Sequence, residues 1–237
     1  MSEFSIYLKS GPRRRKTMVH VLDILGCIAR GPTTESALEA TPEAIRAYLR
    51  FLQRHGEAVE TEGAFTTRVA VHITDGAWLG NGDPTPGFAP DFQPLSLEDM
   101  HLYLRRLAWL HADLPNLVSN VSQEQLQAEP EGSGRSIYQM LEHVAGSDCV
   151  YLRMAVGKVD GLSEALKALQ PDMETLPRAL THLWQIIHTR LENMTETERT
   201  ALVPHGQVTW TARRGLRRML EHGWEHFMEL SHRLSSP

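Results

Sequence analysis

Residues 219–228 of this 237-residue chain read Met-Leu-Glu-His-Gly-Trp-Glu-His-Phe-Met, and this stretch decides how the C-terminal half is interpreted. Its two histidines, His222 and His226, are four positions apart. On an α-helix this separation places two side chains on one face, with Cβ atoms about 5–6 Å apart. Two imidazoles on such a helix can bind the same metal ion.

The spacing alone is weak evidence, because the chain contains 12 histidines. Such a composition gives roughly 0.6 pairs with this spacing by chance. Helical geometry adds more, since each residue advances about 100° around the axis and Leu216, Phe227 and Leu230 then form one apolar stripe. His222 and His226 lie at the margin of this stripe. The stretch therefore predicts an amphipathic helix with both imidazoles beside its buried face.

A third histidine, His143, lies in another predicted helix that contains the same local sequence. Residues 140–143 read Met-Leu-Glu-His, as do residues 219–222. His143 also lies at the margin of an apolar stripe. Both predicted helices therefore carry histidine at the same margin, beside the buried stripe and open to a groove. From the residues alone, the alternative is that all three are ordinary solvated or hydrogen-bonded histidines.

Four long helical patterns occupy residues 96–237, and each has one apolar face. Ser96 is a candidate N-cap for the first, because Glu98 and Asp99 follow it in the first turn. The predicted helices lie at about 96–118, 135–157, 173–194 and 211–234. No strand pattern separates them, and the connections 157–172 and 195–210 are long enough for a crossover. The pattern predicts an all-α four-helix bundle.

Residues 1–78 have a different pattern, with short β-branched or aromatic segments around one helix. The predicted elements are strands at 4–8, 18–24, 58–62 and 67–74 and a helix that starts at Thr33 or Thr34 and stops before Gly56. We interpret the last two strands as a hairpin. The expected order is β-β-α-β-β, a small α+β domain in a multidomain chain.

Residues 79–95 are rich in proline and glycine and cannot continue a helix or a central strand. This segment is interpreted as a connector between domain 1–78 and domain 96–237. Phe88 and Phe92 indicate that the connector is attached to a surface.

Composition limits the function. A formal net charge of −5 and a pI near 6.2 exclude a general nucleic-acid binder. The basic run at residues 13–16 is interpreted as a solvated loop tip, with an acidic partner as the alternative.

Two cysteines, Cys27 and Cys149, indicate reduced thiols. No signal peptide or membrane span is recognised, so we expect a cytoplasmic protein without membrane contact.

Residues 21–38 read Val-Leu-Asp-Ile-Leu-Gly-Cys-Ile-Ala-Arg-Gly-Pro-Thr-Thr-Glu-Ser-Ala-Leu. This segment resembles the HicB-like family of small antitoxin-type domains. The resemblance implies a small α+β protein-interaction domain that is often dimeric and binds a protein partner. No helix-turn-helix or ribbon-helix-helix pattern follows it.

Residues 136–148 read Ser-Ile-Tyr-Gln-Met-Leu-Glu-His-Val-Ala-Gly-Ser-Asp, and residues 210–226 read Trp-Thr-Ala-Arg-Arg-Gly-Leu-Arg-Arg-Met-Leu-Glu-His-Gly-Trp-Glu-His. Together they resemble the DinB/YfiT-like superfamily of metal-binding four-helix bundles. The resemblance implies that His143, His222 and His226 are metal ligands. Three imidazoles leave a coordination position for water or substrate, as catalytic sites do. Zinc is the favoured ion, and nickel is the alternative.

The same resemblance implies an activity, because several members of this superfamily are thiol-dependent S-transferases or isomerases and others look like hydrolases. We therefore expect a metal-dependent enzyme that activates a small thiol for attack on an electrophile, or activates water. No further catalytic residue is identified, although Ser147 is a candidate contact for a metal-bound water. Glu142, Glu221 and Glu225 are interpreted as solvated or salt-bridging. The alternative is a regulatory protein, a homodimeric metal-binding scaffold that binds a protein through its N-terminal domain.

Overall fold

The computed structural model describes residues 2–76, 78–83, 85–130 and 134–235. The chain divides into two compact units, Met1–Gln93 and Pro94–Pro237, and each is described by itself. Residues 79–93 of the expected connector belong to the first unit. A sheet-containing region followed by a helical region confirms the two-part layout at this level.

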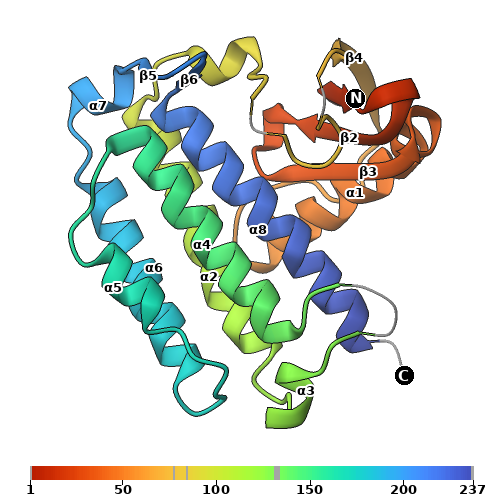
Figure 1. Ribbon diagram of the computed structural model, residues 1–237. Coiled ribbons are helices and arrows are strands. Elements are labelled where there is room, and N and C mark those ends of the chain that lie inside the picture. The colour runs from red at the N-terminus through yellow and green to blue at the C-terminus, as the bar shows by residue number, and fades with distance from the viewer. Residues whose placement is uncertain (1, 77, 84, 131–133, 236–237) are drawn as a thin grey trace. The chain divides into compact units, whose positions relative to one another are not determined.

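The first unit is a four-stranded sheet with helix α1 packed on strands β2 and β3 (Figure 1). Its elements are β1 (Ser2–Ser10), β2 (Arg15–Val21), β3 (Cys27–Thr33), α1 (Thr34–Arg54) and β4 (Phe65–Ile73), with short 3₁₀ turns at Pro12–Arg14, Leu22–Ile24 and Ala89–Phe92. The strand order is β3-β2-β1-β4; β4 pairs with β1 in parallel, and the other pairs are antiparallel. Thr33 caps α1 by accepting a hydrogen bond from the Ser36 N–H, and threonine is one of the residues preferred at an N-cap.

The predicted order β-β-α-β-β is wrong, because the structure has β-β-β-α-β. No strand was predicted at residues 27–33, where β3 lies; Gly31 and Pro32 are tolerated in it because β3 is at the edge of the sheet, where a proline interrupts no central ladder. Residues 58–62 form no strand. The predicted hairpin is therefore wrong as well, since the partner of β4 is the distant strand β1.

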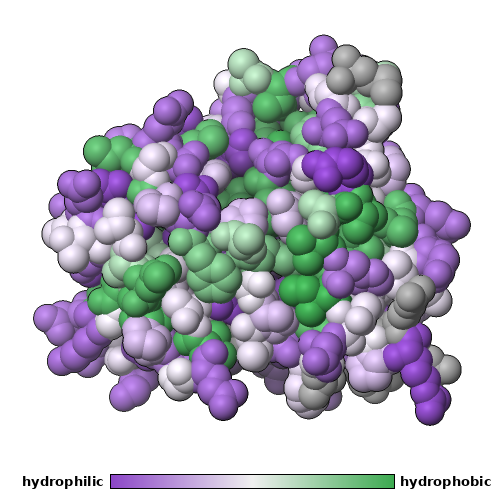
Figure 2. Space-filling view, turned by 90° about the horizontal axis from the view of Figure 1, so that it is seen from above, coloured by the Kyte–Doolittle hydropathy of each residue, from purple (hydrophilic) through white to green (hydrophobic). Residues whose placement is uncertain are grey.

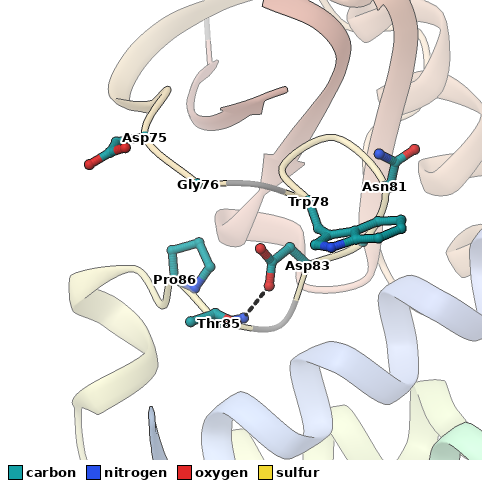
Figure 3. A pocket seen from close by; sticks show the side chains of 8 residues that line it. Asp75, Gly76, Trp78, Asn81, Asp83, Thr85 and Pro86 are labelled. Carbon is teal, nitrogen blue, oxygen red and sulfur yellow. Dashed lines mark hydrogen bonds between the residues drawn. The ribbon is translucent and has the colours of Figure 1, made fainter. Parts of the chain in front are cut away.

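The proline-rich segment after β4 is attached to the sheet of its own unit. Phe88 is 1% exposed, and its ring lies 5.1 Å from the ring of Tyr7 and 5.2 Å from that of His20. The Lys9 ammonium donates to the Pro86 carbonyl at 2.5 Å. A hollow of about 560 Å³, lined by residues that include Trp78, Asp83 and Pro86, lies in this segment, and the Thr85 N–H donates to Asp83 there (Figure 3). In Figure 3 the Asp75 side chain points away from those of Trp78 and Asp83.

The second unit is built on four long helices. They are α2 (Leu97–Leu117), α4 (Ile137–Val156), α6 (Leu176–Glu192) and α8 (Ala212–Ser235), joined by the short elements α3 (Gln123–Gln127), α5 (Leu162–Lys167), α7 (Glu196–Thr200), β5 (Val203–His205) and β6 (Val208–Trp210). Helix α8 packs on α4 and α2, and α6 packs on α2 and α4 (Figure 1). Ser96 caps α2 by accepting from the Asp99 N–H.

Two glycines bring α8 close to its neighbours. A Cβ on Gly223 would lie 2.7 Å from Leu110 of α2, and a Cβ on Gly215 would lie 3.2 Å from the Ala155 Cβ of α4. Side chains at these positions would separate the helices, because contacts this short are repulsive. Gly223 therefore lets α8 pack closely on α2, and Gly215 lets it pack closely on α4, the helix that carries His143.

The expectation that residues 195–210 contain no strand is wrong. They form α7 and the antiparallel hairpin β5–β6. Each strand has only three residues, too few for an alternating pattern to be visible. Gly206 takes a φ of 62° between them, a conformation that glycine adopts without strain.

On the face seen in Figure 2, hydrophobic side chains gather in separate patches among hydrophilic ones. The exposed large hydrophobic residues include Val69 and Val71 of β4 and Trp78. Among the residues that the structure describes, no helix is long and apolar enough to cross a membrane.

Candidate metal centre

The structure brings the three predicted histidines together. His143 projects from α4, and His222 and His226 project from successive turns of α8. One ligand atom from each lies within 4.8 Å of the others. The Nε2 atoms of His143 and His222 are 3.0 Å apart. A tetrahedral zinc ion with Zn–N distances of about 2.0–2.1 Å requires N···N separations of about 3.3 Å, so the His143–His222 pair is already close to the separation that a shared ion needs.

The sequence positions His143 through the start of α4. Ser136 accepts a hydrogen bond from the Gln139 N–H, and the Gln139 side chain accepts one from the Ser136 N–H. This capping box fixes where the helix begins. Leu141 and Val144, both 0% exposed, then fix which face is buried. His143 is left at the edge of that face and partly exposed.

The chemistry of the donor set fits a cation. His222 is 9% exposed and His226 is 7% exposed, so neither is well solvated. Two neutral imidazole nitrogens 3.0 Å apart repel each other through their lone pairs unless a proton or a cation lies between them. The ring planes are inclined at 71° to 82°, and the ring centroids lie 4.6–5.2 Å apart. The three rings therefore converge without stacking.

Burial keeps two of these histidines neutral at pH 7. Desolvation, together with the nearby Arg135 and His226, lowers the pKa of His143 to about 4, whereas Glu229 acts in the opposite direction. Desolvation likewise holds the pKa of His222 well below its usual value, with His226 and Arg218 adding to the effect. Neutral imidazoles carry the free lone pair that a metal ligand needs.

His226 has a carboxylate partner that sequence reasoning missed. Its Nδ1 lies 3.0 Å from the Glu229 Oε2, three residues further along α8. A hydrogen bond at Nδ1 leaves Nε2 free as the ligand atom and orients the ring, which is the usual role of a carboxylate behind a metal-binding histidine. The i,i+3 spacing of His226 and Glu229 on one helix face was the available signal.

The other glutamates near the histidines have different roles. Glu221 is 1% exposed and pairs with Arg217 at 2.6 Å, so it is not solvated. Glu142 accepts a hydrogen bond from the Tyr138 hydroxyl at 3.2 Å. The pairing of Glu221 with Arg217 agrees with the expectation that this carboxylate is salt-bridging.

His222 is held by packing. Its Nδ1 is buried and has no hydrogen-bond partner within the described part of the chain. The Tyr151 ring meets the His222 ring edge to face, with centroids 6.1 Å apart. Tyr151 is itself fixed by a hydrogen bond that its hydroxyl accepts from Arg218 at 3.0 Å.

The surface of α4 is open close to His143. A Cβ on Gly146, one turn after His143, would meet no atom within 4 Å. Ser147 follows at the next position and is partly exposed. The structure records no contact between Ser147 and the three histidines, so its interaction with a bound water remains a prediction.

Taken together, a helical unit with three converging imidazoles, two of them kept neutral by burial, defines a candidate metal-binding helical domain. The sequence model of the DinB superfamily matches residues 106–230, which is more than half of the chain. The chain belongs to the DinB superfamily, whose members often bind divalent metals. No curated protein and no solved structure gives a significant match. The match does not extend to residues 21–38, so the HicB-like resemblance stays a prediction.

Proposed function

We propose that the second unit is a metal-dependent enzyme on a four-helix bundle formed by α2, α4, α6 and α8. His143, His222 and His226 would bind one divalent ion, with zinc favoured and nickel as the alternative. The activity that we propose is transfer of a small thiol to an electrophile. The observation that carries the proposal is the convergence of three imidazoles beside open space.

The ion and the side chains around it would have separate roles. A divalent ion with an open coordination position supplies Lewis acidity, which lowers the pKa of a coordinating thiol or water. Glu229 orients the His226 ring, and burial keeps His143 and His222 neutral. The electrophile would approach over the open surface at Gly146, three residues after His143.

In the proposed reaction, the thiol sulfur forms a bond to an electrophilic carbon. The bond from that carbon to its leaving group breaks, and the leaving group departs with the electron pair. The thiol proton is released to solvent or to the leaving group, so no oxidant or reductant is needed. If water replaces the thiol, the same site performs hydrolysis.

A conjugation assay tests this proposal. Full-length protein loaded with zinc or with nickel is incubated with chlorodinitrobenzene and one of three thiols: glutathione, cysteine or mercaptoethanol. We expect conjugation above the uncatalysed rate, and we expect it to be lost in His222→Ala but kept in His101→Ala, whose histidine is exposed on α2. Hydrolysis of nitrophenyl acetate without conjugation of any thiol would replace the transferase with a hydrolase.

A second function concerns the first unit, for which we propose self-association. Strand β4 is at the edge of the sheet and pairs on one side only, with β1. Val69 is 48% exposed and Val71 is 38% exposed on this strand. An exposed edge strand with apolar side chains is a template for pairing with another chain. We propose a second copy of this protein as that chain, which gives a homodimer and agrees with the HicB-like resemblance.

Light scattering on the purified protein distinguishes the outcomes. A dimeric mass that becomes monomeric in Val71→Lys, but not in Val150→Lys, supports pairing through β4; Val150 is a matched control that is 49% exposed on α4. A monomeric wild-type protein, or a dimer that is unaffected by Val71→Lys, contradicts it.

A further inference from the structure

A second polar cluster lies among α2, α4 and α6 and shares no residue with the candidate metal centre. The His111 Nε2 is 3.1 Å from the Asp148 Oδ2, and the His111 Nδ1 is 3.1 Å from the His188 Nε2. The Trp184 indole N–H donates to the same Asp148 oxygen at 3.1 Å, and its ring stacks on His111 with centroids 4.3 Å apart. These contacts form a continuous hydrogen-bonded chain from Asp148 through His111 to His188.

The inner end of this chain is deeply buried. Asp148 is 0% exposed, and its Oδ1 is buried with no hydrogen-bond partner among the described residues. A carboxylate in this position is poorly stabilised, because only one of its oxygens receives hydrogen bonds. Burial accordingly raises the pKa of Asp148 to about 8, although Trp184 and His188 act to lower it. At pH 7 the hydrogen-bonded chain from Asp148 to His188 therefore carries a proton on Asp148, its buried end.

The outer end of the chain opens into a groove of about 750 Å³ between α2 and α6. This volume is within the usual range for small-molecule sites, about 300–1,000 Å³. Within the part of the chain that the structure describes, the groove is lined by apolar residues, neutral polar residues, three histidines and one arginine, and by no acidic residue. The lining residues are Ala108, His111, Ala112, Pro115, Asn116, Pro177, Arg178, Thr181, His182, Trp184, Gln185 and His188.

We propose that this groove binds a small organic carboxylate with an apolar body, and that the chain Asp148–His111–His188 supplies a cationic His188 for the ligand to contact. The apolar walls would cover the body of the ligand. Arg178, exposed on α6, would meet its charge at the rim of the groove. His188 is the residue that touches the ligand, whereas His111 and Asp148 act through it as positioning residues.

The proton that charges His188 comes from Asp148. The Asp148 proton passes to the His111 Nε2, and the His111 Nδ1 proton passes to the His188 Nε2. The Asp148 O–H bond and the His111 Nδ1–H bond break, and two new N–H bonds form. The result is an Asp148 carboxylate, a neutral His111 and a cationic His188. No proton is exchanged with solvent. The Trp184 N–H and the His111 N–H then both donate to the new carboxylate.

The groups that face His188 agree with this assignment. Without a ligand, burial lowers the pKa of His188 to about 4, and His111 adds to this effect, while Glu192 and Asp148 oppose it. His188 is therefore neutral at pH 7 in the empty groove. An anion at its ring favours the cationic form, because an opposite charge within about 4–6 Å stabilises an ionised group.

Calorimetric titration of the full-length protein with benzoate tests the proposal. Benzamide has nearly the same shape without the charge, and benzylamine has the opposite charge. We expect benzoate to bind at least about tenfold more tightly than either, with an affinity that is constant between about pH 5.5 and 7, since the proton is internal. Tighter binding of benzylamine, or no benzoate binding, overturns the proposal.

Variants separate the relay from a merely structural role. Asp148→Asn cannot supply the proton, so benzoate affinity should become dependent on pH and strengthen toward about pH 5.5 as His188 takes its proton from solvent. His188→Gln should weaken benzoate binding at least about tenfold, and His101→Gln, on the exposed side of α2, should not. His222→Ala should retain binding, which excludes the metal centre as the site. An unchanged affinity in His188→Gln, or a pH profile that Asp148→Asn leaves flat, contradicts the proposal.

Discussion

The Nδ1 atom of His226 lies 3.0 Å from the Oε2 atom of Glu229, almost one helical turn further along α8. This contact fixes the orientation of one candidate ligand from within the helix that carries it. His222, the other ligand candidate on α8, has no such partner among the described residues and depends on packing against Tyr151. The His226 ring is thus held by a hydrogen bond to Glu229, and the His222 ring is held by packing against Tyr151.

Glu229→Gln is expected to weaken metal binding by about 10–100-fold, because a carboxylate that orients a ligating histidine has this effect in known metal sites. The Glu229 side chain is 51% exposed, so the substitution should leave the fold intact. Competition with a chromogenic chelator measures the affinity. Glu142→Gln on the exposed face of α4 is the matched control, and an equal loss in both variants would show that orientation of His226 is not the cause.

Glu221→Gln is expected to destabilise the protein by about 3–5 kcal/mol, the usual effect of removing one partner of a buried ion pair. Glu221 and Arg217 are each 1% exposed and lie 2.6 Å apart. Chemical denaturation of the metal-free protein gives the free energy of unfolding. The exposed pair Lys158–Asp160 provides the control, since Asp160→Asn should leave the stability unchanged.

Alanine substitutions at two glycines in long helices should change the stability of the protein in opposite directions. Gly215→Ala is expected to destabilise by about 1–3 kcal/mol, because the new Cβ would lie 3.2–3.3 Å from Ala155 and from the backbone oxygen of Tyr151. Gly146→Ala is expected to stabilise by about 0.5–1 kcal/mol, since its Cβ meets no atom and alanine favours a helix. Thermal and chemical unfolding of both variants compare them directly. Stabilisation of both would mean that α8 does not pack closely on α4 at Gly215.

Asp148 should make the stability depend on pH in an unusual direction. Its pKa is raised to about 8, so between about pH 4 and 8 the folded protein holds a proton that the unfolded chain releases. The free energy of unfolding contributed by this residue therefore falls as the pH rises through that window. Asp148→Asn cannot ionise, and the difference in stability between wild type and variant should shift in favour of the variant as the pH rises from 4 to 8. A constant difference would show that Asp148 is ionised in the folded protein.

Periodicity predicted the four long helices, since an apolar stripe recurring with the helical period is a local property of the sequence. It also placed His222 and His226 on one face of α8. The approach of His143, 79 residues before His222, followed from a family resemblance and not from spacing.

Other features could not be predicted because they depend on distant pairing. Strand β3 was missed because Gly31 and Pro32 are tolerated only where the sheet ends. The partner of β4 is β1, which is more than 60 residues away. The hydrogen-bonded chain from Asp148 to His188 joins three helices; His111 and Asp148 are 37 positions apart in the sequence, and His111 and His188 are 77 positions apart. Local patterns carry no information about such contacts.

Elemental analysis of the purified full-length protein, beside His143→Ala and the exposed control His101→Ala, tests the central claim most directly. If the three imidazoles bind one ion, wild type and His101→Ala should each contain about one equivalent of zinc or nickel after dialysis, and His143→Ala should contain much less. A wild-type protein that retains no divalent metal after incubation with either ion, or a His143→Ala variant that retains as much as wild type, would contradict a metal centre at His143, His222 and His226.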